Sequence, residues 1–226
     1  AVDLDAGAAT TTVTSGAGAG DDIGFSSTID DAAGDTSLTL DAGASGNVAV
    51  TGAIGGTNRI AALTVTNSAV TDLNDVKTAG AIDVTAGTRI DLNGTTLSSN
   101  DGSIELKGAV DLAGAGTVTL DSDADADATD GAIAITGAVS DTGSDSALTL
   151  DAHSDQVDLA NVVVNGALAV TGGNIDLTGT TYTSTTAAIA FNGAVDLDAG
   201  AATTPVTSGG GAGADIGFRS TIDDAA

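Results

Sequence analysis

The chain has 226 residues, with 31 acidic side chains against five basic ones and a formal net charge of −26 at pH 7. So acidic a chain excludes nucleic acid as an electrostatic partner, because phosphate binding needs a basic face, and a bare anionic membrane is unfavourable too. Hydrophobic residues make up 42% of the chain, aromatic residues only 2%, and the mean hydropathy is +0.25. These values exclude a disordered chain and argue against a broad globular core.

Short strands are predicted along the whole chain, because apolar residues take alternate positions and Gly, Asn, Asp or Thr-Gly closes each run. In chain order the predicted strand segments are 1–6, 37–42, 47–52, 62–67, 81–86, 89–94, 103–108, 109–114, 117–122, 132–137, 147–152, 167–172, 174–179 and 188–193. No segment offers ten residues at helical spacing, and Glu, Lys, Arg, Gln and Met are scarce. Both the period and the propensities therefore exclude helix.

Strands of three to five residues cannot stand alone, so we expect them to stack in parallel coils of roughly 21–24 residues. Val, Ile and Leu would then form ladders inside, Asp, Thr and Ser would lie outside, and each coil would bond to the coils above and below. The 32 glycines supply the tight corners between the strands. The predicted fold class is all-β, a parallel β-solenoid.

A long internal repeat covers both ends of the chain. Residues 1–33 return at 194–226 with 29 of 33 positions identical, at an offset of 193 residues. Repetition at so long a period is typical of units that stack on copies of themselves. We therefore interpret 1–226 as one continuous solenoid window from a tandem array.

The 193-residue period is itself a duplication. The GAVDL run at 108–112 returns at 193–197, and residues 25–42 align without gaps with 135–152. The units run 2–109 and 110–194, and 195–226 begins the next repeat. At the expected coil length the first unit holds about five coils and the second about four, or about nine coils per period.

One stretch accounts for the difference in length between the units. Residues 41–80 of the first unit correspond to only 151–166 of the second, while both flanks stay in pattern. Loss of 24 residues without disturbing the flanks predicts the loss of one whole coil. The interior of the extra coil would contain Val48, Val50, Leu63 and Val65.

The densest candidate site is a run of alternating acids after a predicted strand. Its carboxylates are Asp121, Asp123, Asp125, Asp127 and Asp130. Calcium takes six to eight oxygen ligands, which alternate residues of a turning backbone can supply. Ala126 and Ala132 occupy the positions where an EF-hand needs Gly and Glu, so the hypothesis is a looser calcium site, and a solvated acidic loop is the alternative. No cofactor is otherwise required.

Catalytic chemistry has little to build on. His153 is the only histidine and there is no cysteine, so neither an ordinary transition-metal site nor a convincing triad can be assembled. Paired aspartates could serve a polysaccharide-cleaving β-helix, but such an enzyme needs aromatic or basic subsites, and the aromatic residues are only Phe25, Tyr182, Phe191 and Phe218. We expect no enzyme, and we interpret these aromatic residues as core residues.

The strings GAVDL, GAIAITG and SALTLDA, at 108–112, 131–137 and 146–152, resemble the filamentous haemagglutinin type of adhesin and the giant repeat-containing surface proteins of bacteria. The resemblance covers the whole chain and implies a right-handed parallel β-helix that is exported and projects from the cell surface. Strong acidity and the long repeat period depart from the better known members. No run of about 18 apolar residues predicts a membrane span.

The functional expectation is an elongated stalk or fibre in the structural or adhesive repeat region of an extracellular bacterial surface protein. Its partners would be neighbouring copies of its own repeat, and, through regions outside this window, other cells, surfaces or glycans. The alternative is a self-assembling filament, sheath or S-layer-like coat subunit, and the remote alternative is a polysaccharide-active enzyme.

Overall fold

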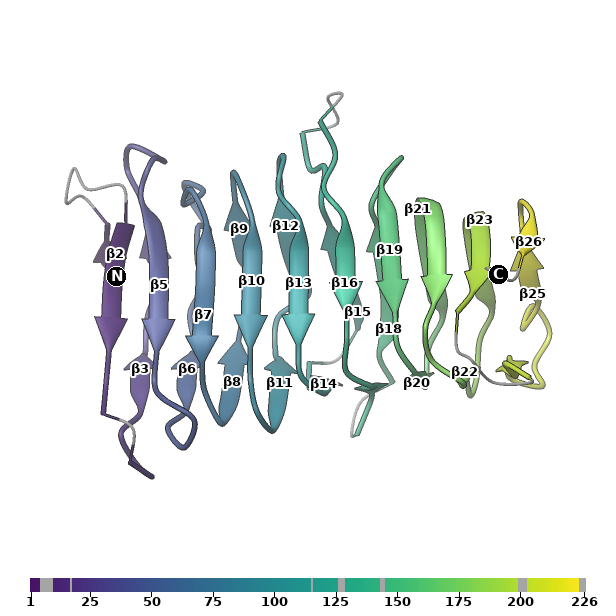
Figure 1. Cartoon of the computed structure of the whole chain (residues 1–226), viewed down its shortest axis with the longest axis horizontal. Helices are drawn as coiled ribbons and strands as arrows, with labels where there is room; N and C mark the ends of the chain where they lie inside the picture. The colour runs from purple at the N-terminus through teal and green to yellow at the C-terminus, as the bar shows by residue number, and fades with distance from the viewer. Residues whose placement is uncertain are drawn as a thin grey trace.

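A computed structural model describes residues 1–4, 10–16, 18–114, 116–125, 129–142, 145–198 and 203–223. It is an all-β parallel solenoid of about nine coils, each with three faces, and the prediction of fold class is confirmed. In Figure 1 the strands of the second face run downward at the front, and the chain returns upward behind them while it advances from the N-terminal to the C-terminal end. This sense of winding makes the coil right-handed.

Each face is a ladder of strands taken from successive coils. The first face contains β1 (Val2–Asp3), β4 (Ile29–Asp30), the bridge residue Ile54, β9 (Val76–Thr78), β12 (Thr96–Ser99), β15 (Thr117–Asp121), β18 (Ala147–Asp151), the first halves of β21 (Leu168–Leu177) and β23 (Ile189–Leu197), and β25 (Ile216–Phe218). The second face contains β2 (Thr10–Thr14), β5 (Ser37–Asp41), β7 (Leu63–Asn67), β10 (Ile82–Thr85), β13 (Ile104–Lys107), β16 (Ile133–Ile135), β19 (Gln156–Leu159), the second halves of β21 and β23, and β26 (Ile222–Asp223). The third face contains β3 (Ile23–Phe25), β6 (Val48–Val50), β8 (Val70–Leu73), β11 (Arg89–Leu92), β14 (Val110–Leu112), β17 (Val139–Ser140), β20 (Val162–Val164), β22 (Tyr182–Ser184) and β24 (Val206–Thr207).

The interior is one continuous core along the axis. On the second face Ile82, Ile104, Ile133 and Val157 are stacked in register, and all four are completely buried. Burying a side chain of this size contributes about 1.5–3 kcal/mol, and every coil repeats the contribution. The alternation of apolar and polar residues along each strand therefore specifies whether a side chain points into the core or out to solvent.

The aligned segments 25–42 and 135–152 form the same side-chain-to-backbone hydrogen bond at a corner of the coil. Asp31 accepts hydrogen bonds from the backbone N–H of Thr36 (2.6 Å) and Ala33 (3.1 Å), and the Thr36 hydroxyl donates to the Leu4 carbonyl of the previous coil (3.0 Å). In the aligned segment Asp141 accepts from Ser146 N–H (2.9 Å). Burial opposes ionisation of Asp31, but these backbone donors outweigh it and lower the pKa of its carboxyl.

At a second corner an aspartate accepts backbone hydrogen bonds from the next coil, and a glycine packs closely against it. Asp75 accepts from the backbone N–H groups of the next coil at Thr95 (2.8 Å) and Thr96 (3.0 Å). Gly94 lies against that corner, where an added Cβ would lie 2.4 Å from the Asp75 backbone nitrogen. Because that approach is shorter than any real Cβ contact, only glycine fits there.

Residues 41–80, which make the first unit longer than the second, contain one additional coil. Strands β5, β7 and β10 are consecutive on the second face, so residues 41–80 pass through two coils. Strand β18 pairs directly with the first half of β21, so 151–166 form a single coil. The interior residues expected for the extra coil, Val48, Val50, Leu63 and Val65, are at most 1% exposed.

Several strands of the structure lack the apolar alternation on which the sequence prediction rests. They include β2, β9 and β12, which place Thr or Ser where other strands place Val or Leu. Thr78 and Ser99 are nevertheless completely buried, because each hydroxyl donates to the Gly80 carbonyl. No helix in the described ranges is long and apolar enough to cross a membrane.

Candidate functional site

The acidic loop begins where β15 ends, at the corner between the first and second faces, and it projects from the solenoid in Figure 1. Asp121 Oδ1 accepts from the Asp123 backbone N–H (3.1 Å), and Ala124 N–H donates to the Ser99 carbonyl of the previous coil (2.9 Å). Asp123 is only 2% exposed. The start of the loop is therefore anchored to the coil, and Asp127 lies outside the described residues.

The next coil closes over this loop with a histidine and a serine. His153 Nδ1 lies 3.3 Å from Asp123 Oδ2 and its Nε2 lies 3.8 Å from Asp151 Oδ1. Ser154 donates both its hydroxyl and its backbone N–H to Asp130 Oδ2, the latter at 2.9 Å. These donors lower the pKa of Asp130. His153, the single histidine, for which the sequence predicted no site, thus holds the loop to its neighbour.

A guanidinium also acts on the same carboxylates. Arg59 lies two to three coils away in the chain, and its Nη1 donates to the carbonyls of Thr78 and Ser98, both at 3.0 Å. Burial lowers the pKa of Arg59, whereas the charges of Asp121 and Asp125 act to raise it. The arginine therefore supplies positive charge to the loop from its own chain.

Calcium at this loop stays a prediction. Within the ranges that the structure describes, no three carboxylate or imidazole side chains are grouped so that they could hold a metal ion. Asp121 and Asp125 share the field of Arg59, whereas Asp123 and Asp130 contact the next coil. The described part of the loop has protein partners for its charge.

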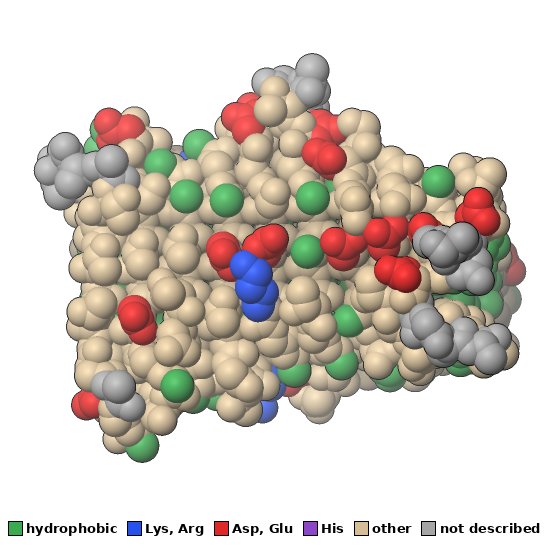
Figure 2. All heavy atoms as spheres, in the orientation of Figure 1, with side chains coloured by type: hydrophobic (Ala, Val, Ile, Leu, Met, Phe, Trp, Pro, Cys, Tyr) green, Lys and Arg blue, Asp and Glu red, His purple; other side chains and the backbone are tan. Residues whose placement is uncertain are grey.

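The second feature is a column of carboxylates along the second face, which we term the acidic column. Its members occupy the same outward register position in successive coils and are Asp83, Glu105, Asp158, Asp176, Asp196 and Asp223, with Ala134 between the second and third. Figure 2 shows acidic side chains in a row across this face, with a basic group against one part of it. Neighbours in such a column are about 4.8 Å apart, so their charges repel.

The negative charge of the acidic column is compensated differently at Asp83 and at Asp176. Lys107 Nζ donates to Asp83 (2.9 Å) and contacts Glu105 (2.5 Å), and these partners raise the pKa of the lysine. At Asp176 the donors are amides, since Gln156 Nε2 donates to it at 2.7 Å and Asn174 Nδ2 at 2.5 Å. Burial and the charges of the neighbouring column members raise the pKa of Asp176.

A shorter column follows the third face. Asp72, Asp91 and Asp111 are in register on β8, β11 and β14. Arg89 binds Asp91 at two points, through Nε and through Nη2 at 2.8 Å. Burial and the adjacent Asp91 raise the pKa of Asp72. Sequence reasoning missed both columns, although the repeated -x-Asp-x- in the predicted strands is a signal for them once coil register is known.

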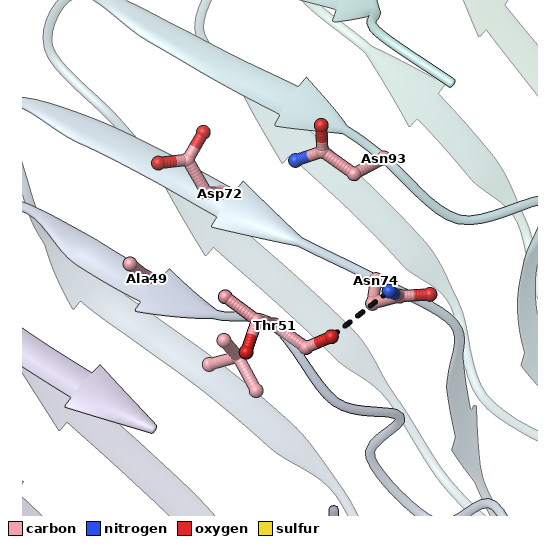
Figure 3. Close-up of a pocket in the computed structure, with 6 residues that line it drawn as sticks. Ala49, Thr51, Asp72, Asn74 and Asn93 are labelled. Carbon is pink, nitrogen blue, oxygen red and sulfur yellow. Dashed lines mark hydrogen bonds between the residues drawn. The ribbon is translucent and has the colours of Figure 1, made fainter. Parts of the chain in front are cut away.

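The third face also contains a shallow hollow of about 340 Å³, shown in Figure 3. Its polar lining comes from Thr51, Asp72, Asn74 and Asn93, and Asn74 Nδ2 donates to the Thr51 carbonyl at 3.0 Å. The lining offers one carboxylate and two amides, with no imidazole, thiol or cation among its six residues. Such a surface can hydrogen-bond a polar molecule, but it lacks a paired acid and base.

The chain was also compared with protein-family models, with curated proteins and with solved structures, and none of the three gives a match.

Proposed function

We propose that this chain is the structural repeat region of an extracellular bacterial surface protein, serving as an elongated stalk or fibre. The proposal is supported by a single core that runs the length of the solenoid and by three faces that carry mostly small polar side chains. Its extracellular placement comes from the resemblance of its strands to surface adhesins. Binding of cells, surfaces or glycans would belong to regions outside residues 1–226.

The observation that carries the proposal is the join between the two copies of the repeat. The second copy begins inside β23, where Val195 stacks in register on Ile175 of the preceding coil, and Ile222 stacks on Val195. No linker separates the repeats, so each repeat extends the same ladders. A protein built this way gains length in proportion to the number of its repeats.

The expected increment follows from the coil spacing. One period runs from β1 on the first face to Val195 on the second face eight coils later, which is eight and one third coils, and at about 4.8 Å per coil this gives about 40 Å per repeat. The high negative charge opposes side-by-side contact between rods at low ionic strength. A stalk of separate rods is therefore favoured over a coat.

Electron microscopy of chains with one, two and four periods tests the proposal. We expect isolated thin rods whose length grows by about 40 Å with each added period. Regular lattices or side-by-side arrays at low salt would instead support the self-assembling coat. Antibodies against residues 1–226 should label intact cells that express the native protein, and labelling only after lysis would refute the surface location.

A further inference from the structure

The first copy of the repeat has a definite position on the three faces. Its AVDL strand, β1, lies on the first face, where Val2 pairs with Ile29. Its TTTVT strand, β2, lies on the second face against β5, and its IGF strand, β3, lies on the third face against β6. The STID segment then returns the chain to the first face at β4.

The second copy has the same order of strands, but every strand is moved on by one face. Its AVDL segment at 194–197 lies on the second face, where Asp196 pairs with Asp176. Val206 and Thr207 lie on the third face against β22, and the IGF strand β25 lies on the first face against Phe191. The final ID pair, β26, is on the second face.

The count of coils explains this displacement. From β1 the first face continues through β4, Ile54, β9, β12, β15, β18, residues 168–171 and residues 189–192. Eight complete coils lie between β1 and residues 189–192, and the AVDL segment of the second copy follows on the second face of the ninth coil. One period therefore spans eight and one third coils, and 193 residues over this number give about 23 residues per coil.

We propose that successive repeats of this protein are rotated by one solenoid face, one third of a turn, so that three repeats pass before a surface residue returns to its original face. The inference rests on the proposed function as a tandem-repeat stalk. The two units inside one period also differ by one face, but in the opposite sense, because Asp91 and Asp111 lie on the third face and their counterparts Asp176 and Asp196 lie on the second. On three faces, two such steps back equal one step forward, which is the displacement of a whole period.

The rotation determines what kind of partner can use the surface of the stalk. Asp3 and Asp30 pair on the first face, whereas their counterparts Asp196 and Asp223 extend the acidic column on the second. In an array, the carboxylates of one repeat thus appear on all three faces in turn. No face is a continuous flat contact surface with one set of residues, so the array fits a partner that binds one repeat locally from any side, and it disfavours sheets formed by one repeated face.

Disulfide trapping within the 226-residue chain tests directly which face the second copy occupies. The chain has no cysteine of its own, so only the introduced pair can form a disulfide. The pair Asp196→Cys with Asp176→Cys should oxidise readily, since register neighbours on one face lie within disulfide reach. The matched pair Asp196→Cys with Thr171→Cys should not, because Thr171 lies on the first face under Asn192. The opposite pattern would mean that the period is a whole number of coils, and it would overturn the inference.

Cryo-electron microscopy of a chain with six periods and one gold-labelled cysteine per period, at the position of Thr183, tests the array. Thr183 is an outward residue of β22. Labels should advance by about 40 Å and one face per period, and should return to the same face after about 120 Å. Labels in a straight line would overturn the rotation but leave the stalk intact. If the expected disulfide forms but the six-period chain does not form rods, the proposed stalk is refuted, while the one-face displacement between the two copies in the 226-residue chain still holds.

Discussion

The two ends of the chain contain the same residues in different surroundings. In the first copy Ile29 is completely buried, because Val2 lies on one side of it and Ile54 on the other. In the second copy Ile222 is 51% exposed, with Val195 on one side and no described coil on the other. Burial in this fold is therefore a property of the neighbouring coils, and the same strand can be core or edge.

The strongest test of this comparison is one substitution made at both positions. Ile29→Asp places a carboxylate in the middle of the core and should lower the free energy of unfolding by about 4 kcal/mol or more. Ile222→Asp should change it by about 0.5 kcal/mol or less, as expected for an exposed position. Urea unfolding followed by circular dichroism measures both. Equal losses would show that the C-terminal coil is already a full part of the core.

The two units of one period offer a second comparison, because Tyr182 in the second unit corresponds to Leu97 in the first. Both side chains are completely buried, but the tyrosine hydroxyl donates to the Leu159 carbonyl (2.6 Å) and accepts from Gly179 N–H (2.9 Å). Tyr182→Phe leaves these buried groups without a partner and should lower the free energy of unfolding by about 1–3 kcal/mol. A loss below about 0.3 kcal/mol would mean that water replaces the hydroxyl.

Alkaline titration provides an independent measurement, because Tyr182 is the only tyrosine. Burial raises its pKa to about 12 from an ordinary value of 10.0. The neutral form is favoured in the folded chain, so its stabilising contribution is present below pH 10.0 and is lost as the pH rises toward 12. Phenolate absorbance should appear near pH 10 in urea and about two pH units later in the native chain. Coincident titrations would place the hydroxyl in solvent.

Charge repulsion gives a smaller effect, tested at the aligned residues Asp91 and Asp176. Asp176→Asn relieves repulsion in the acidic column and should raise the free energy of unfolding at pH 7 by up to about 1 kcal/mol, less at high salt. Asp91→Asn removes the charge and one of the two acceptor oxygens that bind Arg89, and should lower the free energy of unfolding by about 0.5 kcal/mol. Thermal unfolding at two salt concentrations distinguishes them, and stabilisation of the same size in both variants would contradict the assignment.

The pH dependence carries a definite sign for Asp176. Its raised pKa means that the folded chain holds this proton more tightly than the unfolded chain, whose ordinary pKa is 3.8. The contribution is thus fully present below pH 3.8 and is lost as the pH rises through the folded-state pKa. In the wild type this group should favour folding as the pH falls from neutral toward 4, and Asp176→Asn should lack that gain.

Calcium is expected to have the smallest effect. At millimolar affinity, 1 mM calcium would add about 0.4 kcal/mol to the free energy of unfolding. The melting temperature of the wild type should then rise more than that of Asp123→Asn/Asp125→Asn. Magnesium and matched ionic strength serve as controls. Equal shifts in the two proteins would mean general screening of the acidic surface, and the loop would be a solvated turn held by His153 and Ser154.

The alternation of apolar and polar residues was enough to predict strands and their stacking in parallel coils, because side-chain direction along a strand depends only on local geometry. The repeat was predictable from residue identity alone, since 29 of 33 positions recur at an offset of 193. The extra coil at 41–80 was predictable for the same reason, since deleting one full coil leaves every flank in register. Strands such as β9 and β12 were not, because their buried Thr and Ser are satisfied only by carbonyls at the coil corners.

Which face a strand occupies was decided by the tertiary structure alone. Residues 1–30 and 194–223 are almost the same, yet every strand differs by one face, because position on the solenoid depends on the number of corners already turned and not on the strand's own side chains. The acidic column and the contact of His153 with Asp123 have the same origin. They join residues from neighbouring coils, and only the length of each coil determines which residues become neighbours.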